Sequence, residues 1–187
     1  LKFDFLGLTN LTILAKALDL ISEKQGFRIE LEQIPLDDAK AFSLLARGDT
    51  VGIFQMESSG MTRHIKELKP SSVSDVAAMI ALYRPGPMEH IETFIDAKHG
   101  RAQVKFPHET LIDILADTHG VIVYQDQVFF IARDFAGYTL GEADILRKAM
   151  GKKVPEIMAQ ERKKFIQGAL NLGHSLDIAG NVFDLIE

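Results

Sequence analysis

Four positively charged side chains gather in one short stretch, Gly137–Lys153. Arg147 and Lys148 lie near its middle, and Lys152 and Lys153 follow at its end. The chain as a whole carries a net charge of −5, so this cluster stands out against an acidic background. Clustered cations are typical of a site for phosphate, but cations at a helix C-terminus also complement the helix dipole. Both interpretations remain open, and any phosphate here would be held by side chains because the P-loop and GxGxxG patterns are absent.

A second candidate phosphate ligand, Arg84, begins the sequence Arg84-Pro85-Gly86-Pro87. Each proline fixes its own φ and disfavours helical conformation in the residue before it. The sequence therefore predicts a stiff corner that presents the arginine. A guanidinium held in this way can bind a phosphate or a carboxylate through two parallel hydrogen bonds. A corner with a purely structural role is the alternative.

Lys2 and Asp4 share one face of a predicted short strand, Leu1–Leu6, and Phe3 and Phe5 point the other way. A carboxylate at a strand end is a possible ligand for a hard metal ion, which prefers oxygen. The alternative is a solvent-facing ion pair of little energetic value. The scattered histidines and the absence of cysteine argue against a zinc site.

The basic stretch carries the signals of a helix. Thr139 and Glu142 have the spacing of a capping box at its start. Gly151 is expected to follow its last residue, and Pro155 to begin the next helix. The apolar residues fall on one helical face: Ala143, Leu146, Ala149 and Met150.

Arg147 and Lys148 lie off this apolar face, so they are free to meet a ligand. Asp144 precedes them by three and four residues, the spacings at which helical side chains meet. The carboxylate could therefore orient either cation.

Apolar residues at helical spacing, with capping residues before them, predict helices along most of the chain. Helices are expected at about 9–24, 89–98, 110–116, 155–172 and 177–186. Asp37 or Asp38 is expected to cap a helix that ends at Gly48, and Ser58 and Ser59 can cap one that Pro70 stops. Ser72 with Asp75 starts another helix, and residues 128–135 continue as a helix after the strand-like run. The helix that follows Ser72 is expected to bury four side chains: Val73, Val76, Ala77 and Ile80. Besides Leu1–Leu6, only Val51–Phe54 and Val121–Tyr124 resemble strands. The predicted fold class is mainly α, a multi-helical domain with one short N-terminal strand and one or two minor strands.

Composition limits the classes of function. Hydrophobic residues make up 47% and charged residues 25% of the 187 positions, as in ordinary globular chains. No apolar run approaches the roughly 20 residues of a membrane span, so we expect no membrane partner. The absence of cysteine suits a reducing compartment, and we expect a cytoplasmic location. The chain begins inside a strand-like pattern and stops inside a helical one, which suggests a piece of a longer protein.

Seven stretches, taken in order, carry a family resemblance. They are LKFDFLGL (Leu1–Leu8), IPLDD (Ile34–Asp38), GIFQMESSGM (Gly52–Met61), ALYRPGPM (Ala81–Met88), FIDAKHGR (Phe94–Arg101), YQDQV (Tyr124–Val128) and AGYTLGEADILRKAMGKK (Ala136–Lys153). Their order and spacing resemble the alpha subunits of bacterial DNA polymerase III, the C-family replicative polymerases. The resemblance implies that residues 1–24 are the C-terminal end of a palm domain, a strand plus a helix. Residues 25–187 would then be a fingers domain, truncated at its C-terminal end.

The same resemblance implies a nucleotidyltransferase that adds deoxynucleotides to a primer by two-metal phosphoryl transfer. Asp4 matches the third of three palm aspartates that hold two magnesium ions, and the other two lie upstream of this sequence. Lys2 matches a palm lysine that faces the incoming triphosphate. Arg147 and Lys148 match a basic pair that contacts the nucleotide phosphates. That pair is often two arginines, and a lysine keeps the charge but not the bidentate fork.

The implied partners are a deoxynucleoside triphosphate, primer–template DNA and the other replicase subunits. Arg84 and Lys152 are further candidates for contacting the phosphates. The chain alone is expected to be inactive and to bind Mg²⁺ poorly, because one carboxylate is a weak magnesium site. A helical module that binds nucleic acid or protein, without chemistry of its own, is the alternative.

Overall fold

The computed structural model describes residue 3 and residues 5–152 and 155–186. The chain forms two compact units, residues Leu1–Val76 and Ala77–Glu187. The division falls inside helix α4 (Val73–Leu82).

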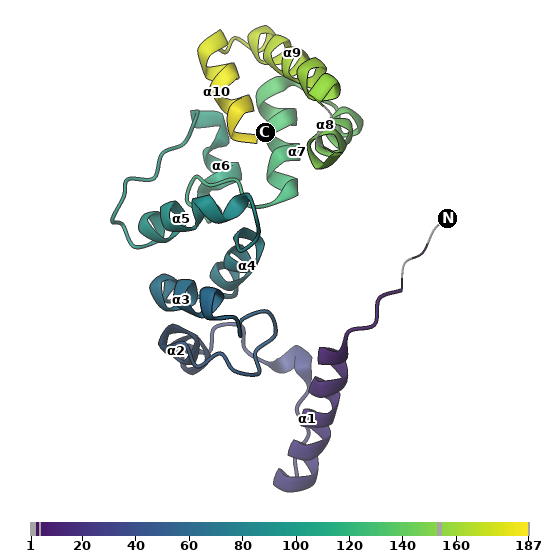
Figure 1. Ribbon diagram of the computed structural model, residues 1–187, viewed down its shortest axis with the longest axis vertical. Coiled ribbons are helices and arrows are strands. Elements are labelled where there is room, and N and C mark those ends of the chain that lie inside the picture. Colours follow the sequence, from purple (N-terminus) through teal and green to yellow (C-terminus); the bar gives the residue numbers. More distant parts are fainter. Residues whose placement is uncertain (1–2, 4, 153–154, 187) are drawn as a thin grey trace. The chain divides into compact units, whose positions relative to one another are not determined.

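The first unit is built of short helices, coloured purple to blue in Figure 1. Its elements before α4 are α1 (Thr9–Gln25), the 3-10 helix η1 (Leu31–Gln33), α2 (Ala39–Arg47) and α3 (Ser59–Leu68). The predicted caps are present. Asp38 Oδ1 accepts hydrogen bonds from the backbone N–H groups of Lys40 at 2.7 Å and Ala41 at 3.0 Å. Ser58 Oγ accepts one from Met61 N–H at 3.3 Å, and α2 packs on α3.

Helix α1 presents its apolar residues to solvent. Leu11, Ile13 and Leu14 are each more than half exposed, and the described part of α1 has no buried residue. The sequence predicts that this helix packs on an N-terminal strand, yet Phe3 and Phe5 are 73% and 96% exposed. An apolar helix left open to water is typical of a surface that another part of a protein covers.

The second unit holds the larger core. Its elements after α4 are η2 (Pro87–His90), α5 (Ile91–Lys98), η3 (Glu109–Leu111), α6 (Ile112–Leu115), η4 (Ala116–Thr118), α7 (Gln125–Ala136), α8 (Leu140–Lys152), α9 (Pro155–Asn171) and α10 (Leu176–Ile186). Helices α7, α8 and α9 pack on one another and α10 packs on α9 (Figure 1). Phe165 lies at the centre of this core, with ring centroids 5.9 Å from Phe135 and 5.4 Å from Phe183.

Gly168 allows α9 to cross the end of α7. A Cβ atom at position 168 would lie 2.0 Å from the carbonyl oxygen of Ala136, the last residue of α7. Backbone atoms cannot yield as a flexible side chain does, so the helices would have to separate. We expect Gly168→Ala to lower the free energy of unfolding by about 2–3 kcal/mol, although alanine is the better helix former.

Gly180→Ala is the matched control, because a Cβ there would meet nothing closer than Arg162 Nη2 at 3.9 Å. Urea unfolding followed by circular dichroism measures both changes. Equal stability of the two variants would contradict the close contact between α7 and α9.

The predicted minor strands are wrong. Val51–Phe54 forms turns, and Val51 is 93% exposed. Val121–Tyr124 is not a strand, and no strand is assigned among the residues that the structure describes. In the predicted N-terminal strand, Leu1–Leu6, the described residues Phe3, Phe5 and Leu6 are not in a strand. The remaining three, Leu1, Lys2 and Asp4, lie outside the described residues. The fold is mainly α, as predicted.

Two helical details also differ from the prediction. Helix α8 continues through Gly151 to Lys152, so this glycine lies inside the helix instead of ending it. Helix α4 buries Ala78, Met79 and Leu82. None of the four side chains expected inside is fully buried: Val73 and Ala77 are exposed, and Val76 and Ile80 are only partly buried.

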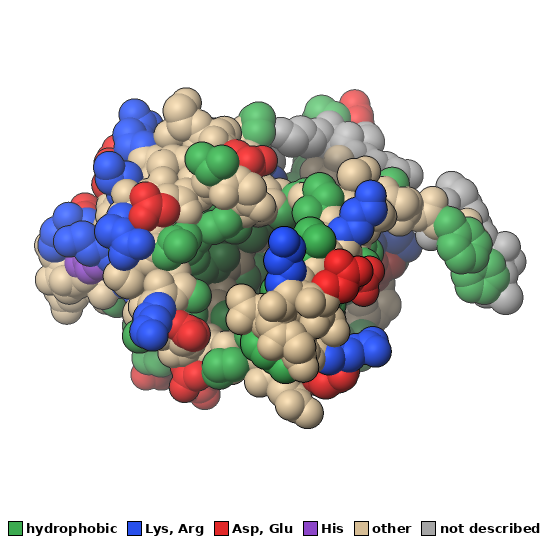
Figure 2. All heavy atoms as spheres, turned by 90° about the horizontal axis from the view of Figure 1, so that it is seen from below, with side chains coloured by type: hydrophobic (Ala, Val, Ile, Leu, Met, Phe, Trp, Pro, Cys, Tyr) green, Lys and Arg blue, Asp and Glu red, His purple; other side chains and the backbone are tan. Residues whose placement is uncertain are grey.

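Charges of both signs and hydrophobic side chains intermingle on the face shown in Figure 2. In the part of the chain that the structure describes, no helix combines the length and the apolar character that a membrane crossing requires.

Candidate functional site

A pocket of about 700 Å³ lies within the second unit. The corner that precedes α5 and the extended segment that leads into α7 line it, together with one side of α8 and the end of α10. Arg84, Arg147 and Lys148 are all among its lining residues. The structure thus brings together three cations that the sequence identifies in separate stretches.

The corner at residues 84–87 holds Arg84 as the sequence predicts. Gly86 has φ 96° and ψ −81°, a conformation that disfavours any residue with a Cβ. Arg84 N–H donates to the carbonyl oxygen of Leu82 at 2.8 Å, and Met88 N–H donates to that of Arg84 at 3.2 Å. The backbone of Arg84 is therefore tied down while its side chain is exposed. Within the described residues, no carboxylate pairs with its guanidinium.

Helix α8 starts at the predicted capping box. The backbone N–H of Thr139 donates to Glu142 Oε2 at 2.8 Å, and the N–H of Glu142 donates to Thr139 Oγ1 at 3.3 Å. Lys164 of α9 adds an ion pair to Glu142 at 2.8 Å. Hydrogen bonds from Lys164 and then from Thr139 lower the pKa of Glu142 to about 2. The carboxylate is thus ionised at neutral pH and fixes both the start and the rotation of the helix.

The apolar face of α8 packs inward as predicted, with Ala143, Leu146 and Ala149 buried. This packing leaves Arg147 and Lys148 at the pocket. Arg147 is the more enclosed cation, with 33% of its side chain exposed against 59% for Lys148. The Arg147 guanidinium lies 6.0 Å from the ring centroid of Phe129 on α7.

Asp144 pairs with both cations, as its spacing predicts. Its Oδ1 accepts from Arg147 Nη2 at 2.8 Å and from Nε at 3.2 Å. Its Oδ2 lies 2.5 Å from Lys148 Nζ. Hydrogen bonds from Lys148 and then from Arg147 lower the pKa of Asp144, so this carboxylate stays ionised.

A single glutamine fixes the extended wall of the pocket. Gln127 Oε1 accepts hydrogen bonds from the backbone N–H groups of Val123 at 2.8 Å and Tyr124 at 2.9 Å. Its Nε2 donates to the carbonyl oxygen of Ile114 at 3.1 Å and to Thr118 Oγ1 at 2.7 Å. One buried side chain therefore satisfies two backbone N–H groups of this segment, which has no neighbouring strand among the described residues.

The pocket is lined by three cations, by one carboxylate, Glu89, and by several apolar side chains. Ile122, Val128 and Met150 line it, and the ring of Tyr124 is 37% exposed beside them. The partial burial of Tyr124 raises the pKa of its phenol, so the hydroxyl is neutral. The three cations suit a ligand with several negative charges, and the apolar side chains suit an apolar part of the same ligand.

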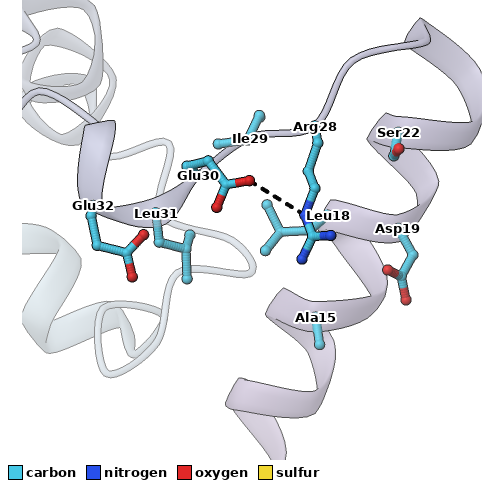
Figure 3. A pocket seen from close by; sticks show the side chains of 9 residues that line it. All are labelled: Ala15, Leu18, Asp19, Ser22, Arg28, Ile29, Glu30, Leu31 and Glu32. Carbon is cyan, nitrogen blue, oxygen red and sulfur yellow. Dashed lines mark ion pairs between the residues drawn. The ribbon is translucent and has the colours of Figure 1, made fainter.

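A second pocket, of about 370 Å³, lies in the first unit beside α1 (Figure 3). Three carboxylates and one cation line it: Asp19, Glu30 and Glu32, and Arg28. Arg28 Nε pairs with Glu30 Oε1 at 3.5 Å. This excess of negative charge does not suit phosphate.

Several predicted ligands cannot be placed. Lys2, Asp4 and Lys153 lie outside the described residues. The backbone of Lys152 belongs to α8, but its side chain is not among those that the structure describes. Among the described residues, no three Asp, Glu or His side chains form a group that could hold a metal ion.

Comparison with known proteins gives the family. The sequence profile of the bacterial DNA polymerase III alpha subunit finger domain matches residues 10–173. The chain belongs to this family. It is 54% identical over 186 residues to the DNA polymerase III subunit alpha of Bacillus subtilis (strain 168). It is 48% identical to the proteins of that name from Pseudomonas aeruginosa, over 197 residues, and Thermus aquaticus, over 192 residues.

Each match covers 100% of the chain but only 16–17% of the relative. The chain thus spans about a sixth of the length of these polymerase subunits. The resemblance seen in the sequence motifs is confirmed.

Three motifs of this fingers chain meet at the pocket. The ALYRPGPM motif supplies Arg84, the YQDQV motif supplies Tyr124 and the Gln127 brace, and the basic helix supplies Arg147 and Lys148. Sequence reasoning used the YQDQV motif for the resemblance but gave its residues no role. The signal that could have found them is a glutamine three residues after Tyr124, the spacing of a capping box.

Proposed function

We propose that the pocket binds the triphosphate of an incoming deoxynucleotide, in a chain that forms the fingers of a replicative DNA polymerase. The observation that carries this proposal is the convergence of Arg84, Arg147 and Lys148 on one pocket that apolar side chains also line. In phosphoryl transfer a protein must position the phosphates and neutralise their charge. Cations held in place around a pocket do both. The guanidinium of Arg147 suits two phosphate oxygens, and Lys148 adds a point charge.

The extent of α8 favours this proposal over simple dipole complementation. The helix reaches Lys152, so Arg147 and Lys148 precede its last turn of about 3.6 residues. The dipole acts on charges mainly within that last turn. It therefore explains a cation at position 152 better than the pair that lines the pocket.

The resemblance extends the proposal to the N-terminal residues. We infer that residues 1–24 complete a palm domain, with Asp4 as a magnesium ligand and Lys2 facing the triphosphate, and that residues 25–187 belong to the fingers. The finger-domain profile begins earlier, at residue 10, so the two boundaries differ over residues 10–24. The exposed apolar side chains of α1 support this assignment, because a palm would cover them. Primer–template DNA and the other replicase subunits are the further partners. With one palm aspartate, the chain alone would not polymerise DNA.

Inorganic tripolyphosphate tests the phosphate site without a base or a sugar. In a full-length polymerase III alpha subunit that carries this sequence, we expect it to inhibit primer extension competitively with nucleotide. The inhibition constant should be the same against each of the four deoxynucleotides, because phosphate carries no base information. Free magnesium is held constant throughout, since tripolyphosphate chelates it.

Orthophosphate at equal ionic strength is the control for screening by salt, and it should inhibit far less. Inhibition that is competitive with primer–template and indifferent to nucleotide would contradict the proposal. It would favour a fingers surface that binds the DNA backbone.

A further inference from the structure

Two of the three pocket cations are already paired in the structure. Asp144 accepts from Arg147 through one carboxylate oxygen and from Lys148 through the other. Both cations line the pocket and Asp144 does not. Asp144 therefore pairs with both cations without itself lining the cavity.

Counting donors shows that the pairing leaves room for phosphate. Arg147 uses Nε and Nη2 toward Asp144, and a guanidinium has five N–H donors. The Nη1 group and one N–H of Nη2 are left, in the plane that Asp144 fixes. Lys148 has three donors, of which one faces Asp144. A phosphate could thus bind both cations without displacing the carboxylate.

We propose that Asp144 is a positioning residue that holds Arg147 and Lys148 toward the pocket before a nucleotide binds. The inference rests on the proposed phosphate site. Long side chains lose much rotamer freedom when they bind a ligand, and Asp144 has restricted both of them in advance. The capping box and the apolar face of α8 fix the position of the backbone. Asp144 in addition fixes the charged ends of the Arg147 and Lys148 side chains.

Two rival roles give different outcomes. A carboxylate that competes with phosphate for the cations would weaken nucleotide binding, and its removal would lower KM. A carboxylate that only stabilises the helix through (i, i+3) and (i, i+4) pairs would change the thermal unfolding and leave the kinetics alone.

The experiment measures single-nucleotide incorporation by the full-length subunit with Asp144→Asn. We expect KM to rise about three- to tenfold, alike for all four deoxynucleotides, with a smaller loss in kcat. Asp144→Glu should recover part of the loss, because it keeps the charge. Asp134→Asn is the matched control: Asp134 forms the same kind of exposed pair, with Arg133 at 2.5 Å, and neither residue lines the pocket. Its kinetics should equal those of the parent.

A double-mutant cycle separates this inference from the proposed function. In an Arg147→Ala/Lys148→Ala background, Asp144→Asn should have no further effect on KM. An unchanged or lowered KM for Asp144→Asn in the parent, or an equal effect in both backgrounds, would overturn the positioning role while leaving the phosphate site standing. A background variant with parental KM would overturn the phosphate site and the positioning role together.

Discussion

Asp4→Asn in a full-length polymerase III alpha subunit is expected to abolish nucleotide addition, lowering kcat about a thousandfold or more. Asparagine keeps the size of aspartate but removes the charge that a hard divalent ion prefers. The family resemblance assigns Asp4 to a set of three aspartates that hold two metal ions. The loss of one ligand therefore disturbs the position of both ions. Single-turnover primer extension at saturating magnesium and nucleotide is the measurement.

Asp113→Asn is the control, because Asp113 is an exposed carboxylate on α6 in the other unit. Thermal unfolding should be the same for both variants and the parent. Lys2→Ala should be milder than Asp4→Asn and should act on nucleotide KM more than on the magnesium requirement. Nearly normal extension by Asp4→Asn would remove Asp4 from the set of metal ligands.

The helix starts that carry capping residues were the most predictable part of this fold, because they depend on contacts between near neighbours in the chain. Asp38 and Ser58 both cap the helices that the sequence assigns to them. So does the Thr139–Glu142 pair at the start of α8. Such caps are formed within three residues of the helix start. They can be read from a short window without knowledge of the tertiary structure.

The predicted strands failed for the opposite reason, since a strand exists only through a partner. Val121 and Val123 are buried, as their apolar character predicts. Their segment meets a glutamine side chain instead of a neighbouring strand. Periodicity indicates that a segment is extended and buried, but not what satisfies its backbone. Gln127 lies only three and four residues from these N–H groups, so it acts as the N3 residue of a capping box at the start of α7 and not as a second strand.

The cations of the site were predictable, and the pocket was not. Arg84 and Arg147 carry local signals, a stiff proline corner and a capped helix. Ile122 and Leu185 of α10 also line the pocket. They come to the same cavity only through the packing of segments that are distant in the sequence. The ion pair from Lys164 to Glu142 likewise joins two helices, and no local pattern predicts it.

Arg147→Ala is expected to cost about 2–4 kcal/mol in kcat/KM, by analogy with the loss of one oxyanion donor. KM should rise alike for all four deoxynucleotides, because a triphosphate carries no base identity. The value of kcat should fall as well, because charge that develops during phosphoryl transfer loses a partner. Affinity for primer–template DNA should change little. Steady-state single-nucleotide incorporation and a separate DNA-binding measurement give these quantities.

Arg133→Ala is the matched control on the neighbouring helix. Arg133 also pairs with a carboxylate, Asp134, and lies over an aromatic ring, with its guanidinium 4.9 Å from the centroid of Phe130. It is absent from the pocket lining, so its removal tests the loss of a similar charge at a different place. Parental kinetics are expected for this variant.

Arg147→Lys separates charge from geometry, since lysine keeps the charge and loses the bidentate fork. We expect its kcat/KM to lie between those of Arg147→Ala and the parent. If the fork matters most in the transition state, more of the loss should be in kcat than in KM. Weakened duplex binding with unchanged nucleotide kinetics in Arg147→Ala would instead make α8 a contact to the DNA backbone. If neither property changes, the cations near the end of α8 only complement its dipole. The position of Arg147 before the last turn of the helix makes this the outcome that the geometry favours least.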